Sequence, residues 1–191
     1  MIRSMSPADR TAVAAVLTDA FTEHELFVWA LPDATTRRDV LAAYFSVEML
    51  NGEVRVHEQD GQILGVAVWL DGSEPSLPQR AWLPVARAAL RLLGPVSIAR
   101  TLYRGWRADR SVHRSRPDTH PPVLGWLAVS PHAQGGGIGR ALVNDGIEHF
   151  PGDAYLECSA SLINYYSRLG FSPVKSFALG AGGPVFTAMS R

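Results

Sequence analysis

A glycine cluster at residues 135–139 constrains the fold more than any other part of the sequence. Four of its five positions are glycine, an apolar run (123–129) precedes it, and a helical pattern (138–150) follows it. Glycine has no Cβ, so the backbone can adopt positive φ and direct several N–H groups at one point. At a helix N-terminus such unpaired donors and the helix dipole favour an anion. The pattern predicts a phosphate-binding loop, with a plain helix-capping glycine turn as the alternative.

The spacing of these glycines excludes two common phosphate-binding motifs. A P-loop has a lysine directly after its last glycine, whereas the only lysine of this chain is Lys175. A dinucleotide-binding motif, G-x-G-x-x-G/A, would begin at Gly137, but Leu142 stands where the last glycine or alanine belongs. The phosphate ligand must therefore be of another kind.

The pattern that does fit is Q-x-x-G-x-G/A over residues 134–139, with a valine and a proline just before it. It resembles the acetyl-CoA pyrophosphate loop of the GNAT-type N-acetyltransferase superfamily. A second segment, Y-x-x-x-G-F at 166–171, resembles another motif of this superfamily. The runs L-E-C-S at 156–159 and V-A-V-W at 66–69 are similar to those of puromycin N-acetyltransferase and its relatives.

The resemblance implies one GNAT-like domain over residues 1–191, with its acetyl-CoA-binding core at about 120–175. Its fold would be α/β, with a mixed, mostly antiparallel sheet of about six to seven strands and helices on both faces. Sequence periodicity agrees with this order of elements. It predicts strands near 2–3, 53–58, 63–70, 123–129, 154–159, 171–179 and 184–189, and helices near 7–21, 35–49, 138–150 and 161–169. Residues 22–31 lack clear periodicity and are expected to form a turn and loop, and Gly125 predicts a bulge or a close backbone approach.

An arginine-rich insertion, residues 76–116, is predicted to form two helices that break at Gly94-Pro95. Nine arginines and one acidic residue, Asp109, give residues 80–116 a net charge of +8, although the whole chain is neutral. Such a segment can attract nucleic acid or an anionic ligand such as the CoA phosphates, or it can be the solvated face of amphipathic helices. No interleaved aromatic stripe accompanies the arginines, so we favour the solvated face and expect no nucleic-acid partner.

Composition narrows the remaining classes. A chain of 191 residues with 47% hydrophobic and 19% charged residues suits one globular domain. No apolar run approaches the ~20 residues that span a bilayer, and the N-terminus lacks the apolar core of a signal peptide. We therefore expect a cytoplasmic protein without a membrane partner. The single cysteine excludes an internal disulfide, and no spacing of His and Asp indicates a metal. A monomer and a homodimer both stay open.

The resemblance assigns the acetyl-CoA contacts to the end of the 123–129 strand and to the glycine loop. The residues expected to bind acetyl-CoA are Leu127, Ala128, Val129, Gln134, Gly135, Gly136, Gly137, Ile138, Gly139 and Arg140. Members of the family usually have a cofactor-contacting Asn four residues before the motif tyrosine. Leu162 stands there in this chain and Asn164 is displaced by two, which leaves Ser159 or Ser161 as a substitute.

The family reaction is direct attack of an amine on the acetyl-CoA carbonyl. It needs a base for the amine proton, a donor for the oxyanion and an acid for the CoA thiolate. The resemblance assigns the acid to Tyr166, and a backbone N–H at a strand bulge near 127–129 could serve the oxyanion. Glu157 is the candidate base, with a purely structural carboxylate weighed equally. Cys158 would point to the opposite face and is expected to be a small buried hydrophobe.

Other titratable residues are placed by analogy only. His24, Glu25 and Asp33 lie where members of this superfamily often line the acceptor pocket, whereas His120 reads more readily as a surface residue. The predicted function is an acetyl-CoA-dependent N-acetyltransferase acting on a primary amine of a small molecule, with acetyl-CoA as co-substrate and no metal. Two alternatives stay open: an acyl-CoA-binding sensor or partner module without catalysis, and a protein N-terminal or lysine acetyltransferase.

Overall fold

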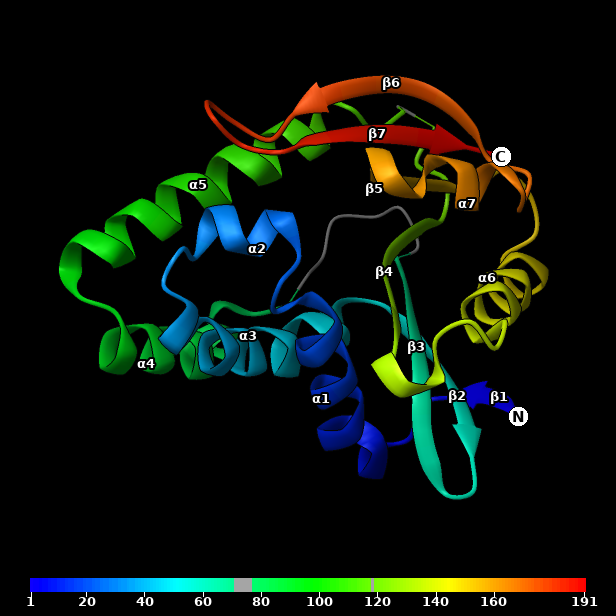
Figure 1. Ribbon diagram of the computed structural model, residues 1–191, viewed down its shortest axis with the longest axis horizontal. Coiled ribbons are helices and arrows are strands. Elements are labelled where there is room, and N and C mark those ends of the chain that lie inside the picture. Colours follow the sequence, from blue (N-terminus) through cyan, green and yellow to red (C-terminus); the bar gives the residue numbers. More distant parts are fainter. Residues whose placement is uncertain (71–76, 118) are drawn as a thin grey trace.

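A computed structural model describes residues 1–70, 77–117 and 119–191, and a seven-stranded sheet lies at its centre (Figure 1). The strand order is β1-β2-β3-β4-β5-β7-β6, and every neighbouring pair is antiparallel except β4 and β5. The strands are β1 (Ile2–Ser4), β2 (Glu53–Gln59), β3 (Gln62–Leu70), β4 (Val123–Val129), β5 (Tyr155–Ser159), β6 (Ser172–Ala178) and β7 (Val185–Ser190). The predicted α/β class with a mostly antiparallel sheet is confirmed.

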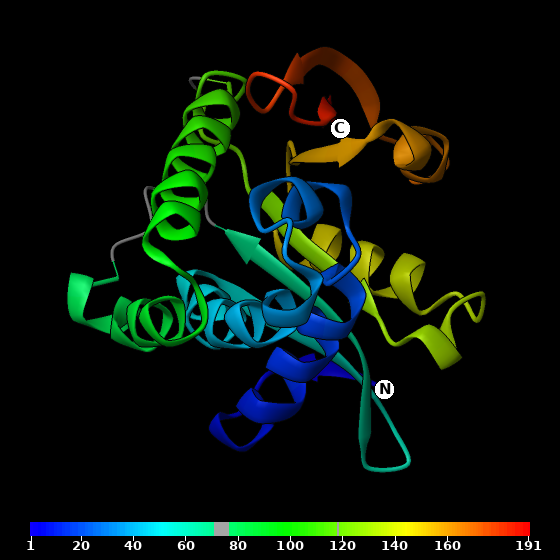
Figure 2. The ribbon, with the colours of Figure 1, turned by 60° about the vertical axis from the view of Figure 1, so that its left-hand side comes forward.

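Helices cover both faces of the sheet, as the sequence predicted (Figures 1 and 2). The helices are α1 (Arg10–Phe21), α2 (Glu25–Ala30), α3 (Ala34–Glu48), α4 (Leu83–Leu92), α5 (Pro95–His113), α6 (Ile138–His149) and α7 (Ile163–Ser167). One core cluster packs α1, α2 and α3 against one face through residues such as Leu17, Phe45 and Val68. A second packs α6 and α7 against the other face through Trp69, Leu142 and Tyr166. The two clusters bury side chains on both faces of β3.

The prediction of a loop at residues 22–31 was wrong for its second half, which forms α2. His24 caps this helix: its Nδ1 accepts a hydrogen bond from the Leu26 N–H at 3.4 Å. Phe27 is buried and stacks on the Trp126 ring, with centroids 5.9 Å apart. A helix of six residues is too short to show a clear period, so packing against a distant strand stabilises it rather than local pattern.

Gly125 forms the predicted bulge in β4. The β3–β4 register passes from Val68 opposite Trp126 to Trp69 opposite Leu124, so Gly125 is the extra residue. We had expected an oxyanion-binding bulge near residues 127–129. The bulge lies before that stretch. Beyond it the register is regular as far as Val129.

The arginine-rich segment folds into the two predicted helices, α4 and α5, and Pro95 is the first residue of α5. The first residue of the predicted insertion, Ser76, lies outside the described residues. Neither helix has a buried residue, although Leu93 between them packs into the first core cluster. Arg104 donates a hydrogen bond to the carbonyl of Trp29 and lies over its ring, 5.3 Å from the centroid. Arg104 thus fastens α5 to α2.

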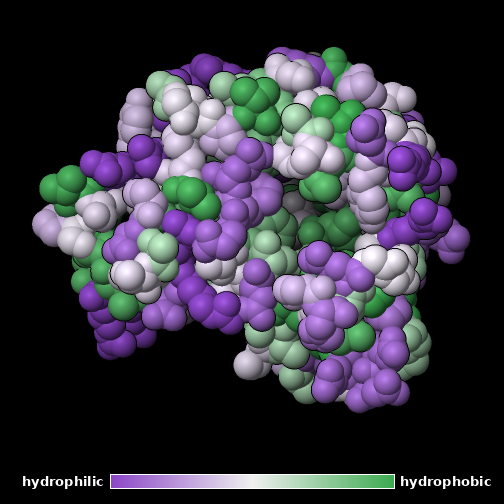
Figure 3. Space-filling model, viewed as in Figure 1, coloured by the Kyte–Doolittle hydropathy of each residue, from purple (hydrophilic) through white to green (hydrophobic). Residues whose placement is uncertain are grey.

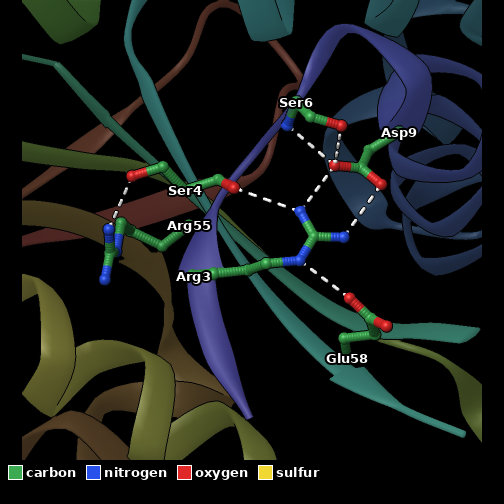
Figure 4. A network of polar contacts seen from close by, with 6 residues as sticks. All are labelled: Arg3, Ser4, Ser6, Asp9, Arg55 and Glu58. Atoms are coloured by element: carbon green, nitrogen blue, oxygen red, sulfur yellow. Dashed lines mark hydrogen bonds and ion pairs between the residues drawn. The ribbon is translucent and has the colours of Figure 1, made fainter. Parts of the chain in front are cut away.

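An arginine network joins β1 to its neighbours (Figure 4). Arg3 Nη1 and Nη2 donate to the Asp9 carboxylate at 2.6 and 3.0 Å, and Arg3 Nε donates to Glu58 at 2.7 Å. The Ser6 N–H also donates to Asp9, at 2.7 Å, as a helix-capping arrangement requires. These bonds hold the N-terminal strand, the entry to α1 and β2 in one arrangement.

Candidate active site

β4 and β5 separate from each other after only two residue pairs. Val123 lies opposite Tyr155 and Leu124 opposite Leu156, and no further pair joins the two parallel strands. The rest of each strand borders an open wedge, which we call the β4–β5 wedge. Figure 3 shows a hollow at the centre of the face that Figure 1 presents, near β4. In the middle of the sheet, the wedge leaves parts of the β4 and β5 backbone edges without a strand partner.

The backbone of Leu127 and Val129 faces the β4–β5 wedge. The Ser130 N–H donates to the Leu64 carbonyl at 2.8 Å, which directs Ser130 toward β3. Backbone groups alternate in direction along a strand, so Leu127 and Val129 point the other way. The side chain of Gln134 agrees with this direction, since its Nε2 donates to the Val129 carbonyl at 3.1 Å. Two N–H donors therefore line the wedge.

The glycine loop connects the end of β4 to the N-terminus of α6. Gly135 and Gly137 have φ of +83° and +80°, which other residues rarely adopt. A Cβ on either would meet nothing within 4 Å, so the surface above the loop is open. Gly137 caps α6, and the first amides of this helix, at Ile138, Gly139 and Arg140, have no carbonyl acceptor within it. This geometry suits a phosphate.

Ala128, one of the expected acetyl-CoA contacts, lies away from the wedge. Its side chain is 2% exposed and packs in the core beneath α1 and α3. Alternation directs its backbone toward β3. The exposed Gln134 forms the hydrogen bond to Val129, which fixes the start of the loop to the end of β4.

Tyr166 lies on α7 in the same core cluster as the wedge-side residues Leu127 and Val129. The side chain is 7% exposed, and its ring contacts Phe171 edge-on, with centroids 6.1 Å apart. Burial raises the pKa of Tyr166 well above its usual value. The phenol therefore carries its proton throughout the neutral pH range.

Glu157 and Cys158 occupy opposite faces of β5, as strand alternation predicts. The Glu157 side chain is 10% exposed, and Arg116 Nε lies 3.4 Å from its Oε1. Burial raises the pKa of Glu157, while the charge of Arg116 opposes that rise. Cys158 is buried against Met189, with the two sulfur atoms 3.6 Å apart, and burial raises its pKa to about 11. Cys158 is thus a protonated thiol in the core, whereas Glu157 has an ionisable side chain near the wedge.

His24, one of the other residues expected near an acceptor, lies near the end of β5. Its ring lies 5.9 Å from that of Phe186, which pairs with Ser159 at the end of β5. Burial lowers the pKa of His24, so its imidazole is neutral at pH 7. Glu25, the first residue of α2, is exposed.

The remaining polar candidates have positions that explain them without a ligand. Asp33 caps α3 by accepting from the Thr35 N–H at 2.9 Å, and His120 is exposed. Ser159 and Ser161, the expected substitutes for the missing Asn, hydrogen-bond to each other at 3.0 Å. Leu162 and Asn164 are both exposed.

Sequence reasoning missed an acidic group on the α3 side of β4. Trp126 Nε1 donates to Glu48 Oε1 at 3.3 Å, across 78 positions of sequence. Glu48 borders a cavity of about 260 Å³ that Tyr44 and Trp82 also line. No sequence motif marks these residues, because they are joined only by the packing of α3 on β4.

The arginine-rich helix α5 and the glycine loop lie at different ends of the molecule in both ribbon views (Figures 1 and 2). This arrangement does not favour a role of α5 in attracting the CoA phosphates. Over the ranges 1–70, 77–117 and 119–191, no three His, Cys, Asp or Glu side chains gather as they would around a metal ion. In that part of the chain no helix is both long enough and apolar enough to span a bilayer.

Comparison with known proteins agrees with this geometry. Residues 100–173 match the family model described as an acetyltransferase (GNAT) domain. No curated protein sequence matches the chain. The family match thus includes β4, the glycine loop, α6, β5 and α7, which together form the β4–β5 wedge and its surroundings.

Solved structures share the fold over nearly the whole chain. One described as histone acetyltransferase HPA2 and related acetyltransferase, from Corynebacterium glutamicum, is 24% identical with a TM-score of 0.74 and covers 100% of this chain and 94% of that one. An N-acetyltransferase from Staphylococcus aureus is 17% identical, with a TM-score of 0.62 and full coverage of both chains. A GNAT family acetyltransferase from Brucella melitensis, in complex with acetyl-CoA, is 19% identical with a TM-score of 0.50. The match covers 98% of this chain and 85% of that one. The chain has the GNAT fold, and the finer likeness to puromycin N-acetyltransferase is not confirmed.

Proposed function

We propose that this protein is an N-acetyltransferase that transfers the acetyl group of acetyl-CoA directly to a primary amine of a small molecule. The observation that carries the proposal is the β4–β5 wedge, which adjoins the glycine loop and has the buried Tyr166 on the α7 side. The family match over residues 100–173 supports an acyltransferase. A protein of the same fold was solved with acetyl-CoA bound, which supports the choice of donor.

The residues present fit acetyl-CoA as the donor substrate. The amides of the glycine loop and of the first turn of α6 would bind its pyrophosphate. The pantetheine arm carries amide groups in an extended chain, and the wedge-facing backbone groups of Leu127 and the Val129 N–H can pair with them as a strand edge pairs with a peptide. The proposed acetyl-CoA-binding core is the segment 120–175.

The proposed reaction is a single displacement at the acetyl carbonyl. The neutral amine attacks the carbonyl carbon, a C–N bond forms, and the C–S bond then breaks. A wedge-facing N–H of Leu127 or Val129 would stabilise the oxyanion. The amine loses its proton to a base, and the CoA thiolate receives one from the phenol of Tyr166, whose raised pKa keeps that proton available. We propose Glu157 as the base, because its raised pKa brings a carboxylate nearer to the pKa suited to proton transfer at neutral pH.

A second candidate is an acyl-CoA-binding module of the same fold without catalysis. Leu162 is the observation that favours it, because the family's cofactor-contacting Asn is missing there. A protein acetyltransferase is a further alternative, since the description of the Corynebacterium structure names a histone acetyltransferase. The run L-E-C-S at 156–159 supports an amine of the puromycin kind among the small-molecule acceptors.

The test combines binding with turnover. Isothermal titration with acetyl-CoA measures donor binding, and release of free CoA thiol is then followed with a panel of amines. The panel contains an aliphatic monoamine, a diamine, puromycin, an amino acid and a lysine-containing peptide. We expect binding together with thiol release on small amines. Binding without release on any acceptor would favour the non-catalytic module, and release on the peptide alone would favour the protein acetyltransferase.

A further inference from the structure

The cavity beside Glu48 lies between α3, α5 and the segment that precedes α4. Its volume is about 260 Å³, and its lining residues are Tyr44, Glu48, Asn51, Leu77, Trp82 and Asp109. Sites for whole drug-sized ligands measure roughly 300–1,000 Å³. This cavity is smaller, so it suits one end of a ligand, such as a charged head group with a short chain.

Glu48 contributes a carboxylate to one wall of this cavity. Its carboxylate accepts from Trp126 Nε1 at 3.3 Å and from Asn51 Nδ2 at 2.8 Å, and both donors are neutral. Over the described ranges no arginine or lysine forms an ion pair with it. Burial and the charge of Asp109 raise the pKa of Glu48. A second carboxylate, that of Asp109, lines the same cavity, and its Oδ1 lies 3.3 Å from His113 Nε2 on α5.

The other walls of the cavity suit a cation that carries N–H donors. Tyr44 and Trp82 lie side by side with ring centroids 5.9 Å apart, and aromatic faces attract cations. The side-chain carbonyl oxygen of Asn51 is buried and has no hydrogen-bond partner in the part of the chain that the structure describes. A buried acceptor without a donor is costly, and an ammonium group would satisfy it. A neutral apolar group would leave this oxygen unpaired, and an anion would be repelled.

We propose that this cavity binds an organic ammonium group, and that this group is the second positive charge of the acceptor. The part about the acceptor rests on the proposed function. Glu48 is tied through Trp126 to β4, and the next residue of that strand, Leu127, faces the β4–β5 wedge. An acceptor whose two amines are separated by a short alkyl chain could place one in the cavity and one toward the wedge. The preferred substrate class is therefore a diamine or a longer polyamine.

The binding test uses 1,5-diaminopentane and 1-aminopentane, which differ only in the second amine. Isothermal titration without acetyl-CoA is run on the wild type and on Glu48→Gln, Asp109→Asn and Asp153→Asn. Glutamine keeps the size and hydrogen bonding of Glu48, Asp109 is exposed on α5, and Asp153 is an exposed carboxylate that does not line the cavity. We expect the diamine to bind the wild type at least tenfold more tightly than the monoamine. This preference should fall at least fivefold in Glu48→Gln and in Asp109→Asn, and stay unchanged in Asp153→Asn.

The turnover arm separates this proposal from the proposed function. Thiol release with the same two amines should show the same preference in kcat/KM and the same loss in Glu48→Gln. Diamine binding that depends on Glu48, without thiol release from any amine, would support the cation site and overturn the proposed function. Acetylation of both amines at equal kcat/KM, with equal affinities and no effect of Glu48→Gln or Asp109→Asn, would overturn the cation site and support the proposed function.

Discussion

The hydroxyl of Tyr165 lies directly against Gly139, so close that a Cβ on this glycine would stand 2.7 Å from the oxygen. Gly139 belongs to the first turn of α6, and Tyr165 belongs to α7. The start of α6 is therefore in contact with the residue that directly precedes the tyrosine motif at 166–171. Only a residue without a side chain allows the two helices to approach in this way.

A methyl group at residue 139 should impair donor binding through this contact. In Gly139→Ala, either the tyrosine ring or the first turn of α6 must move, because a carbon cannot lie 2.7 Å from the hydroxyl oxygen. We expect the Kd for acetyl-CoA to rise about tenfold in titration calorimetry, an effect of about 1.4 kcal/mol. The double variant Gly139→Ala with Tyr165→Phe removes the hydroxyl and should regain most of the affinity. No recovery in the double variant would show that the contact is not the cause.

Replacing Tyr166 by phenylalanine should separate binding from catalysis. The variant loses the phenolic proton but keeps the buried ring, so the fold and the Kd for acetyl-CoA should stay as in the wild type. We expect kcat for thiol release to fall by about one to three orders of magnitude, as for the loss of a general acid. Tyr165→Phe, which removes the hydroxyl of the neighbouring tyrosine, is the matched control. Unchanged kcat in Tyr166→Phe would remove the residue from the proposed mechanism.

The pH dependence of turnover tests the role of Glu157. A base must be deprotonated to act, so kcat/KM should rise with pH through the raised pKa of Glu157. Glu157→Gln should lower turnover and abolish this rise. Arg116→Gln keeps the carboxylate but removes the cation that lowers its pKa, so the rise should move to higher pH. Full turnover with an unchanged profile in Glu157→Gln would make this carboxylate structural.

Two helical glycines provide a matched test of packing. A Cβ on Gly146 in α6 would lie 2.2 Å from the indole of the fully buried Trp69, whereas one on Gly105 in α5 would meet nothing within 4 Å. Gly146→Ala should lower the free energy of unfolding by about 2–3 kcal/mol through overpacking. Gly105→Ala should raise it by up to about 1 kcal/mol, because alanine is the better helix former. Urea unfolding measures both, and equal effects of the two would refute the packing argument.

The carboxylate of Asp9 should make the N-terminal arrangement sensitive to acid. Hydrogen bonds from Arg3, then from Ser6, lower the pKa of Asp9. Since its folded-state pKa lies below its unfolded value of about 3.9, its contribution is complete above that value and is lost as the pH falls toward the folded-state pKa. The stability difference between wild type and Asp9→Asn should thus be larger at pH 7 than at pH 3 in urea unfolding. A stability difference that is the same at both pH values would contradict this prediction. The control variant Asp153→Asn should have the same free energy of unfolding as the wild type at pH 7 and at pH 3.

Local sequence signals predicted the elements that depend on neighbours along the chain. The strands predicted near 53–58 and 63–70 form the β2–β3 hairpin, and the Gly94-Pro95 break predicted where α5 begins. The glycine cluster predicted the loop before α6, because positive φ at Gly135 and Gly137 is a local requirement. The assignments of Tyr166 and Glu157 to catalysis stay predictions.

The sequence by itself predicted the strands of the sheet, the glycine loop before α6 and each described α-helix except α2. Only the tertiary structure decided that residues 25–30 form a helix and that Arg104 donates to the Trp29 carbonyl. It also joined Glu48 to Trp126 across 78 positions. The physical reason is that periodicity and turn chemistry act over a few residues. Burial, ring packing and long-range hydrogen bonds depend on partners that only the folded chain brings together.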